Sequence, residues 1–391
     1  MKTPDVFFIS ATRTAIGTFG GTLKDMPPTE LATLVVKQAL NGADIDPSRI
    51  EHVVMGNVIP TQPQDIYLSR VAAIGAGIPE QTPAFNVNRL CGSGLQALVS
   101  AAQLIQTGDA QMVVAGGAES MSRGPYTLSG ARWGNRMGNA QAEDFMLAVL
   151  HDPFKGAHMG ITAENIATRF GISRQAQDEL ALESQRRAAQ AINNGYFAGQ
   201  ISPVEIKTRA GQVLFAQDEH VRATTLEQLA GMKPVFKPDG TVTAGNASGL
   251  NDGASALVLA STESARDLKP LARLVSYAHA GVSPDFMGLG PVPATQLALK
   301  RAGLRVSDLE VIECNEAFAA QAYAVTQALE LDPLRVNPNG SGISLGHPVG
   351  ATGAILATKA IHELHRIQGR YALITLCIGG GQGIAMIIER L

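Results

Sequence analysis

The segment ALNGADIDPSRIEHVV at residues 39–54 recurs in altered form as ALKRAGLRVSDLEVIE at residues 298–313. Ala, Leu, Ala, Ser and Glu repeat at a constant offset of 259 residues, and three apolar pairs match as well, namely Ile45 with Leu304, Ile50 with Leu309 and Val53 with Ile312. A second match follows in the same order, because Val87-Asn88 and Val336-Asn337 each precede a glycine-rich turn, an alanine-rich helix and an apolar strand. The repeat predicts two similar αβ halves paired about a pseudo-two-fold axis.

The first half shows how each unit is built. Its pattern predicts strands at 6–9, 53–55 and 112–115 and helices at 29–40 and 94–106. Alternation of helices with continuously apolar strands is typical of helix-covered, mainly parallel sheets. We therefore expect an α/β fold with mainly parallel sheets.

Residues 119–249 interrupt the repeat and have no counterpart in the second half. This region holds the single tryptophan, Trp133, and a polar amphipathic helix after Ser173, which is a suitable N-cap. We interpret the region as an inserted loop domain over the active face. The expected division is a first core half at 1–118, completed by 250–270, the insertion at 119–249, and a second core half at 271–391.

Composition excludes several classes of protein. The 391 residues carry a net charge of −3 without a long basic run, which argues against nucleic acid as a partner. No apolar run is long enough to span a membrane, and the first residues lack the pattern of a signal or transit peptide. Three widely spaced cysteines favour free thiols, and paired Cys-x-x-Cys zinc motifs are absent. We expect a soluble cytoplasmic protein with no metal site.

Two of the three cysteines are set among glycines. Cys91 lies in NRLCGSGL (88–95) at the start of a predicted helix, where backbone N–H groups and the helix dipole should lower the pKa of the thiol. Cys377 lies in TLCIGGGQG (375–383), at the end of a strand. Each also has a structural interpretation, as a small side chain at a tight turn or strand end.

Two further polar residues are placed for chemistry. His347 lies between Gly346 and Pro348, so its backbone is positioned by the sequence around it. Asn315 follows the strand predicted at 311–314, at the edge where ligands of α/β sheets gather. The neighbouring Cys314 should point to the opposite face and act in packing. The structural alternative for His347 is a turn histidine bonded to a carbonyl oxygen, and the alternative for Asn315 is a strand-end cap or an Asx-turn.

Glycines at 340–346 also suggest a dinucleotide-binding turn. The preceding segment 336–339 contains a proline unsuited to a central strand, and no acidic residue follows at the required distance. An oxidoreductase is therefore the weakest of the enzyme interpretations.

The whole chain resembles the thiolases, a family of acetyl-CoA acyltransferases. The resemblance lies in the motifs RTAIG (13–17), NRLCGSG (88–94), GGAESM (116–121), HMGITAEN (158–165), GNASGLNDG (245–253), GPVP (290–293), NEAF (315–318), GHP (346–348) and CIGGGQG (377–383). It implies two βαβαβαββ halves in a five-layered α-β-α-β-α core with an inserted loop domain. It also implies a homo-oligomer, either a dimer or a dimer of dimers, and residues 132–136 are the expected place for such a contact.

The same resemblance assigns roles. Cys91 is the nucleophile that takes the acyl group, His347 accepts its proton, and Cys377 is the base toward the second acetyl-CoA. Asn315 holds a water that completes one oxyanion hole with His347, and the backbone N–H groups of Cys91 and Gly379 form the other. Residues expected to contact coenzyme A or the acyl chain are His158, Met159, Arg222, Ser248, Met287 and Phe318.

The resemblance is strongest to bacterial biosynthetic β-ketothiolases, which condense acetyl-CoA with acetyl-CoA or a short acyl-CoA reversibly and by a ping-pong route. Coenzyme A thioesters are then substrates, and no permanently bound cofactor is expected. Two alternatives are a degradative thiolase for longer 3-ketoacyl chains and an acyl-CoA-binding protein of the same fold without turnover. The direction of reaction in the cell and the preferred chain length stay open.

Overall fold

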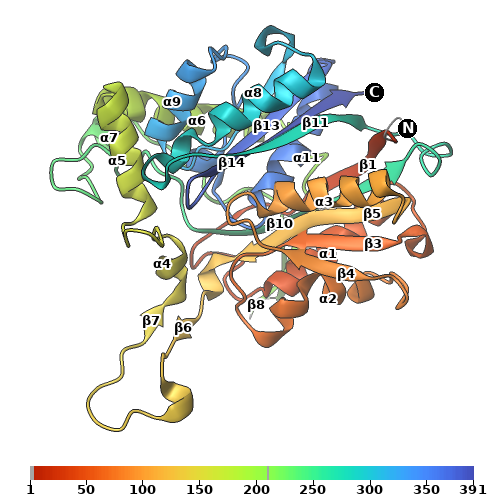
Figure 1. Cartoon of the computed structure of the whole chain (residues 1–391), viewed down its shortest axis with the longest axis horizontal. Coiled ribbons are helices and arrows are strands. Elements are labelled where there is room, and N and C mark those ends of the chain that lie inside the picture. The colour runs from red at the N-terminus through yellow and green to blue at the C-terminus, as the bar shows by residue number, and fades with distance from the viewer. Residues whose placement is uncertain (1–3, 209–210) are drawn as a thin grey trace.

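Two similar halves make up most of residues 4–208 and 211–391, which the computed structural model describes (Figure 1). The first half contains β1 (Val6–Arg13), β2 (Gly17–Thr18), α1 (Pro28–Asn41), β3 (His52–Gly56), α2 (Leu68–Gly75), β4 (Ala84–Val87), α3 (Ser93–Thr107), β5 (Met112–Ser120) and β10 (Asn251–Ser261). The second contains β11 (Ala272–Gly281), α8 (Pro291–Ala302), β12 (Val311–Cys314), α9 (Ala319–Ala328), α10 (Gly342–Leu345), α11 (Thr352–Ile367), β13 (Tyr371–Ile378) and β14 (Gln382–Arg390).

The elements predicted from the pattern are all present. The strand expected at 311–314 is β12, and the helices expected at 29–40 and 94–106 are α1 and α3, each one residue longer at either end. Helix α3 ends at Gly108, whose left-handed φ of 84° a glycine adopts without strain. The glycines at 116–117 lie inside β5, where close packing requires them.

The expectation of mainly parallel sheets is wrong. The strands of the two halves form one mixed ten-stranded sheet in the order β12-β13-β14-β11-β1-β10-β5-β3-β4, with β2 beside β10. Strands β3 and β4, β3 and β5, and β12 and β13 pair in parallel, whereas β1–β10, β10–β5, β11–β14 and β13–β14 are antiparallel. The reason is that the last strand of each half turns back beside the strand before it, which helix spacing alone does not reveal.

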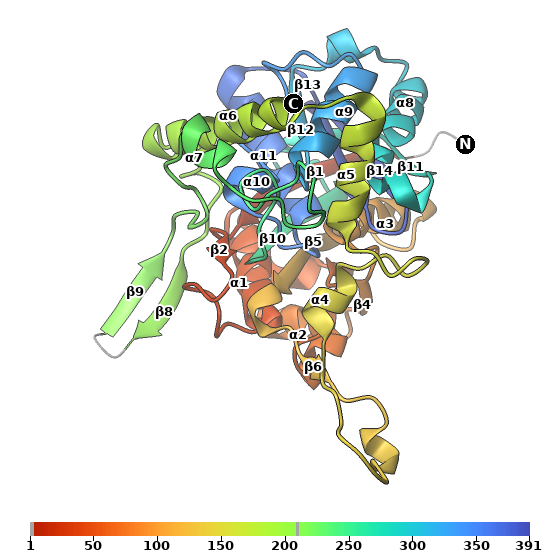
Figure 2. The same ribbon diagram turned by 90° about the vertical axis from the view of Figure 1, so that its left-hand side faces the viewer.

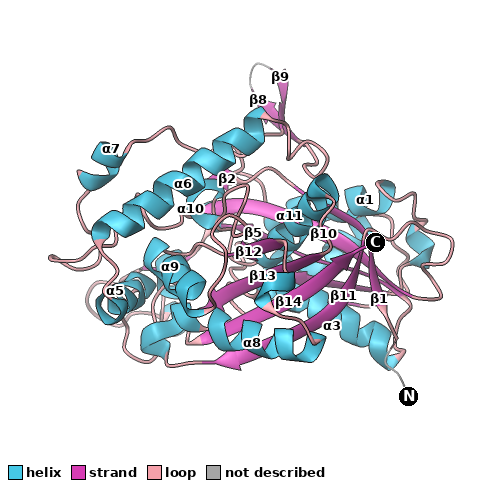
Figure 3. Ribbon diagram, turned by 90° about the horizontal axis from the view of Figure 1, so that it is seen from above, coloured by secondary structure: helices cyan, strands magenta, loops and turns pink. Residues whose placement is uncertain are grey.

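The sheet consists of two half-sheets that meet through a short contact. Strand β1 pairs with β11 only at Phe7–Arg273 and Phe8–Ala272. Helix α1 covers β5 and β10 on one outer face, and α8 covers β11 and β14 on the other. Helices α3 and α11 pack against each other between the half-sheets, in the largest apolar cluster (Figure 1). Seen from above, α8 lies over β11 and β14 (Figure 3). The layers therefore run α-β-α-β-α, as expected for this fold.

The region between β5 and β10 contains β6 (Tyr126–Thr127), β7 (Glu143–Asp144), α4 (Phe145–Val149), α5 (Met159–Phe170), α6 (Arg174–Asn193), β8 (Val204–Thr208), β9 (Gly211–Phe215) and α7 (Leu226–Ala230). Helix α6 begins as predicted, with the hydroxyl of Ser173 accepting a hydrogen bond from the N–H of Ala176. The β8–β9 hairpin and the segment from β6 to β7 project from the body (Figure 2). In the projecting β6–β7 segment, Trp133 is 88% exposed.

We propose that residues 119–249 form an inserted domain. Its limits lie within two residues of the end of β5 at Ser120 and the start of β10 at Asn251. Within the described ranges 4–208 and 211–391, no helix combines the length and apolar character needed to cross a bilayer.

Candidate active site

Cys91, His347 and Cys377 line one cavity of about 420 Å³, although they come from three separate segments. Cys91 lies two residues before α3, His347 lies in the loop between α10 and α11, and Cys377 is the penultimate residue of β13. All three cysteines of the chain are free thiols. The fold thus brings together the two thiols and the imidazole that the sequence singled out.

Cys91 is partly exposed in this cavity and packs against an apolar cluster that includes Val58 and Val349. Burial raises the pKa of its thiol, although the backbone N–H groups of Gly379 and of Cys91 itself act to lower the pKa. The expected lowering at the helix start is therefore wrong, because desolvation outweighs the N–H groups. The preceding Leu90 adopts a left-handed φ of 48°, a costly conformation for leucine that the surrounding structure enforces.

His347 is buried and held in one orientation. Its Nδ1 lies 2.7 Å from the hydroxyl oxygen of Thr352, and that hydroxyl donates its hydrogen to the carbonyl oxygen of Pro348 at 2.9 Å. The imidazole must then carry its hydrogen on Nδ1, which leaves the lone pair of Nε2 free to accept a proton. Burial lowers the pKa of His347 to about 4, so the ring is neutral near pH 7.

Asn315 connects to this imidazole. Its Nδ2 lies 3.4 Å from Nε2 of His347, and its side chain is fully buried. The oxygen Oδ1 has no protein partner among the described residues. A buried amide oxygen without a partner is a suitable place for a water molecule.

Cys377 is 1% exposed and packs with Met287 and Phe318. Burial raises the pKa of its thiol well above the ordinary value, and the nearby Cys91 adds to this effect. Cys314 is fully buried in a separate core cluster, as expected for a packing residue. The two cavity thiols are therefore both protonated at rest, and a thiolate formed at Cys377 would be a strong base.

The residues expected to contact the substrate all line the same cavity. These residues are His158, Met159, Arg222, Ser248, Met287 and Phe318. The ring of His158 stacks on Phe236 with centroids 4.5 Å apart, and burial lowers the pKa of His158 to about 4. A neutral histidine on an aromatic ring gives this wall a largely apolar character.

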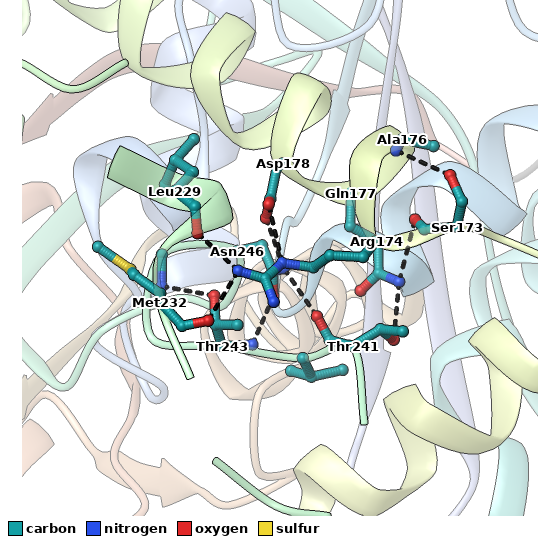
Figure 4. A network of polar contacts seen from close by, with 12 residues as sticks. Ser173, Arg174, Ala176, Gln177, Asp178, Leu229, Met232, Thr241, Thr243 and Asn246 are labelled. Atoms are coloured by element: carbon teal, nitrogen blue, oxygen red, sulfur yellow. Dashed lines mark hydrogen bonds and ion pairs between the residues drawn. The ribbon is translucent and has the colours of Figure 1, made fainter. Parts of the chain in front are cut away.

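A polar network fixes the loop that carries Ser248 (Figure 4). Asp178, in the second turn of α6, accepts hydrogen bonds from Arg174 at 2.8 Å and from the amide of Asn246 at 2.9 Å. The amide oxygen of Asn246 accepts from the N–H of Thr243 at 2.8 Å. Helix α6 thus holds the loop that carries Ser248.

Sequence reasoning did not identify three residues of the site. Thr352 sets the tautomer of His347, Phe236 supports His158, and Glu119 is a fully buried carboxylate at the end of β5. Glu119 could have been found as the one charged residue in the apolar strand MVVAGGAES. Thr352 and Phe236 left no such signal. In the described ranges, no cluster of three or more His, Cys, Asp or Glu side chains is arranged to hold a metal ion.

Comparison with known proteins agrees with this arrangement. The family model "Thiolase, N-terminal domain" matches residues 6–263, and "Thiolase, C-terminal domain" matches residues 268–390. The chain is 63% identical to β-ketothiolase BktB of Cupriavidus necator over 100% of both chains, and 49% identical to an acetyl-CoA acetyltransferase of the same organism over 99% of both. A crystal structure of human mitochondrial 3-ketoacyl-CoA thiolase superposes with a TM-score of 0.98 at 45% identity, covering 99% of each chain.

Proposed function

Because the chain belongs to the thiolase family of acyltransferases, we propose that it is a β-ketothiolase that transfers an acetyl or short acyl group between coenzyme A thioesters. The reaction is a reversible condensation of acetyl-CoA with an acyl-CoA to a 3-ketoacyl-CoA and free coenzyme A. The observation that carries this proposal is the single cavity lined by Cys91, His347 and Cys377.

The first half-reaction loads Cys91. The lone pair of His347 Nε2 takes the proton of the Cys91 thiol, and the thiolate sulfur attacks the carbonyl carbon of the acyl-CoA. The bond from that carbon to the coenzyme A sulfur then breaks. Cys377 gives its proton to the departing sulfur, so free coenzyme A leaves as a thiol and Cys377 becomes a thiolate.

The second half-reaction uses that thiolate. Cys377 takes a proton from the α-carbon of acetyl-CoA, and the resulting enolate carbon attacks the acyl carbonyl on Cys91. The bond between this carbonyl and the Cys91 sulfur breaks, and the Cys91 thiolate recovers its proton from the imidazolium of His347. Covalent transfer divides one difficult step into two, which gives ping-pong kinetics.

Two groups of donors support the negative charge that develops on oxygen. The N–H groups of Cys91 and Gly379 are directed at the Cys91 sulfur, where they would face the oxygen of a bound acyl group. His347 and a water on Asn315 would serve the oxygen of the second thioester. Preset donors of this kind stabilise charge as it develops in the transition state.

The similarity to a β-ketothiolase and to acetyl-CoA acetyltransferases supports a short-chain substrate. Relatives named 3-ketoacyl-CoA thiolase, at 46% identity, keep the longer-chain alternative in place. We also propose a homo-oligomer, a dimer of dimers, since the exposed Trp133 and Met137 project on the β6–β7 segment. Free thiols fit a location in the reducing cytoplasm.

The test is the turnover of acetoacetyl-CoA with free coenzyme A. Turnover is measured as the loss of the enolate absorbance of the substrate. Thiolysis by the reduced protein is expected, and its absence would refute the proposal. A series of 3-ketoacyl-CoA substrates of increasing length then separates the two subtypes. A fall in kcat/KM beyond the shortest chains supports the short-chain enzyme, whereas a rise supports the longer-chain alternative.

A further inference from the structure

Glu119 is a charged residue beside the cavity to which the proposed mechanism gives no role. It lies near the end of β5, in the first half, and its side chain is fully buried. A buried carboxylate is costly unless its oxygens are fully hydrogen-bonded. Its position next to the nucleophile loop therefore needs a reason.

The Glu119 carboxylate accepts four hydrogen bonds, all from N–H groups. One oxygen accepts from the backbone of Val58 at 3.0 Å and of Gly350 at 2.8 Å. The other accepts from the backbone of Ile59 at 3.1 Å and from the side chain of Asn57 at 2.9 Å. Every neighbour donates, so these contacts are satisfied only by an ionised carboxylate.

The donors come from both halves of the molecule. Residues 57–59 follow β3 in the first half, whereas Gly350 belongs to the second half, three residues after His347. Val58 and Val349 both line the cavity and pack in the same apolar cluster as Cys91. One carboxylate thus fastens the loop that carries His347 to the wall beside the nucleophile.

The backbone of the 347–350 loop approaches strand β5 so closely that no side chain fits between them. A methyl group added at Gly350 would lie 2.5 Å from the Glu119 carboxylate, and one added at Gly117 would lie 2.2 Å from the carbonyl oxygen of Gly350. Glycine at these positions lets the loop of the second half rest directly on β5. The position of that loop is then set by the Glu119 oxygens and not by side-chain packing alone.

We propose that Glu119 is a positioning residue that sets the approach of His347 to Cys91 by holding the 347–350 loop against the 57–59 loop. This inference rests on the proposed function, since it assigns Glu119 a part in the acylation of Cys91. Burial acts to raise the pKa of Glu119, whereas the N–H groups of Ile59, Val58 and Gly350 act to lower it. The four donors favour the ionised form, because a hydrogen on either oxygen would face N–H groups and no acceptor.

The test compares Glu119→Gln with Glu119→Asp in the full-length protein. The glutamine NH₂ group opposes either the N–H groups of Val58 and Gly350 or those of Ile59 and Asn57, so each orientation breaks two of the four contacts and weakens the hold on the 57–59 loop. Aspartate keeps the acceptors but is too short to hold both loops. We expect the single-turnover rate of Cys91 acetylation by acetyl-CoA, measured by mass spectrometry after quenching, to fall on the order of 10- to 100-fold for Gln and less for Asp.

Binding separates a positioning role from general loss of structure. The Kd for coenzyme A, measured by calorimetry, should stay within about threefold of wild type, because Glu119 does not line the cavity. The matched control is Glu389→Gln, another buried carboxylate, which bonds Arg273 and Arg370 and no residue of the cavity or its loops. Its acetylation rate should be unchanged.

Acetylation within twofold of wild type in both Glu119 variants, or a slower rate matched by equally weaker coenzyme A binding, would overturn the inference. If Glu119→Gln does not fold, Glu119→Asp decides by the same two measurements. If the wild-type protein itself takes up no acetyl group, the proposed function fails, and that outcome is distinct from failure of the Glu119 inference alone.

Discussion

The two halves of this chain make the same connection in different ways. In the first half, residues 88–92 link strand β4 to α3, and this short turn carries Cys91. In the second half, the counterpart of β4 is a single β-bridge at Val336. The longer segment 337–351 then leads to α11 and carries His347. Since α3 and α11 pack together, the proposed nucleophile Cys91 and its proposed base His347 are presented by equivalent connections.

The connection between the last two strands differs even more. In the second half, β13 and β14 are joined by the glycines at 379–381, directly after Cys377. In the first half, the corresponding strands β5 and β10 are separated by residues 121–250, which provide His158, Met159 and Ser248 to the cavity. All four connections thus contribute residues to one cavity, although they differ widely in length.

The buried layer between the half-sheets shows a third difference. At the offset of the repeat, Val54 and Ser100 of the first half correspond to Glu313 and Lys359 of the second. Lys359 Nζ lies 2.7 Å from Glu313 and 2.6 Å from the carbonyl oxygen of Gly340. The second half therefore contains a buried ion pair where the first half has a smaller, uncharged pair. The pair ties α11 to the loop that leads to His347.

The largest effect on turnover should come from removing either of the two cavity thiols. Cys91→Ala should lose turnover on the order of 10⁴-fold or more and take up no acetyl group, because the nucleophile is absent. Cys377→Ala should lose condensation to a similar extent but still become acetylated, although more slowly, because the departing coenzyme A loses its proton donor. Labelled acetyl-CoA and mass spectrometry check both outcomes. Acetylation of the Cys91→Ala protein would contradict the division of roles between the halves.

The ion pair between the half-sheets is the next test. Lys359→Met leaves Glu313 buried without its partner and should lower the free energy of unfolding by about 3–5 kcal/mol. Adding Glu313→Val, the residue type found at position 54, should restore most of the loss. Urea unfolding of the three proteins measures the difference. If the double variant is no more stable than Lys359→Met, the second half does not accept at position 313 the valine that the first half has at position 54.

Acid stability should report the buried imidazole of the second half. Burial lowers the pKa of His347 from 6.5 to about 4, so the unfolded chain binds one more proton between these pH values. The contribution of His347 is complete above about pH 6.5 and is lost as the pH falls to 4, by about 3 kcal/mol. The free energies of unfolding of wild type and His347→Asn, measured at pH 7 and pH 4.5, separate the contribution of His347 from those of the other histidines. Equal acid sensitivity of the two proteins would contradict it.

The smallest effect should arise in the inserted region. Ser173→Ala removes the N-cap of α6 and should cost about 1 kcal/mol in thermal or urea unfolding. KM for acetyl-CoA should rise while kcat stays near wild type, because the first two turns of α6 support the loop of Ser248 and not the reacting groups. As a control, Asp46→Ala removes the cap of a short helix in the first half and should leave KM unchanged. A fall in kcat for Ser173→Ala would place the insertion in the chemistry.

Much of the fold and the site could be predicted, for identifiable reasons. Cys91, His347 and Cys377 lie among glycines and prolines that mark tight backbone, and the short strand β12 ends directly before Asn315. The antiparallel pairing of β5 with β10 could not be predicted, because their partnership depends on how residues 121–250 return. The raised pKa of Cys91 was missed for a similar reason, since the apolar neighbours that desolvate it come from distant segments.

By itself, the sequence predicted that the chain is built twice, that an insertion interrupts the first copy, and that Cys91, His347 and Cys377 act together, and the three do line one cavity. These features are local, because periodicity, glycine turns and motif spacing are properties of neighbouring residues. Only the tertiary structure decided the hydrogen position on His347, the protonation of the two thiols and the part played by Glu119. Each of these depends on burial and on hydrogen bonds between residues far apart in the chain, such as Glu119 and Gly350.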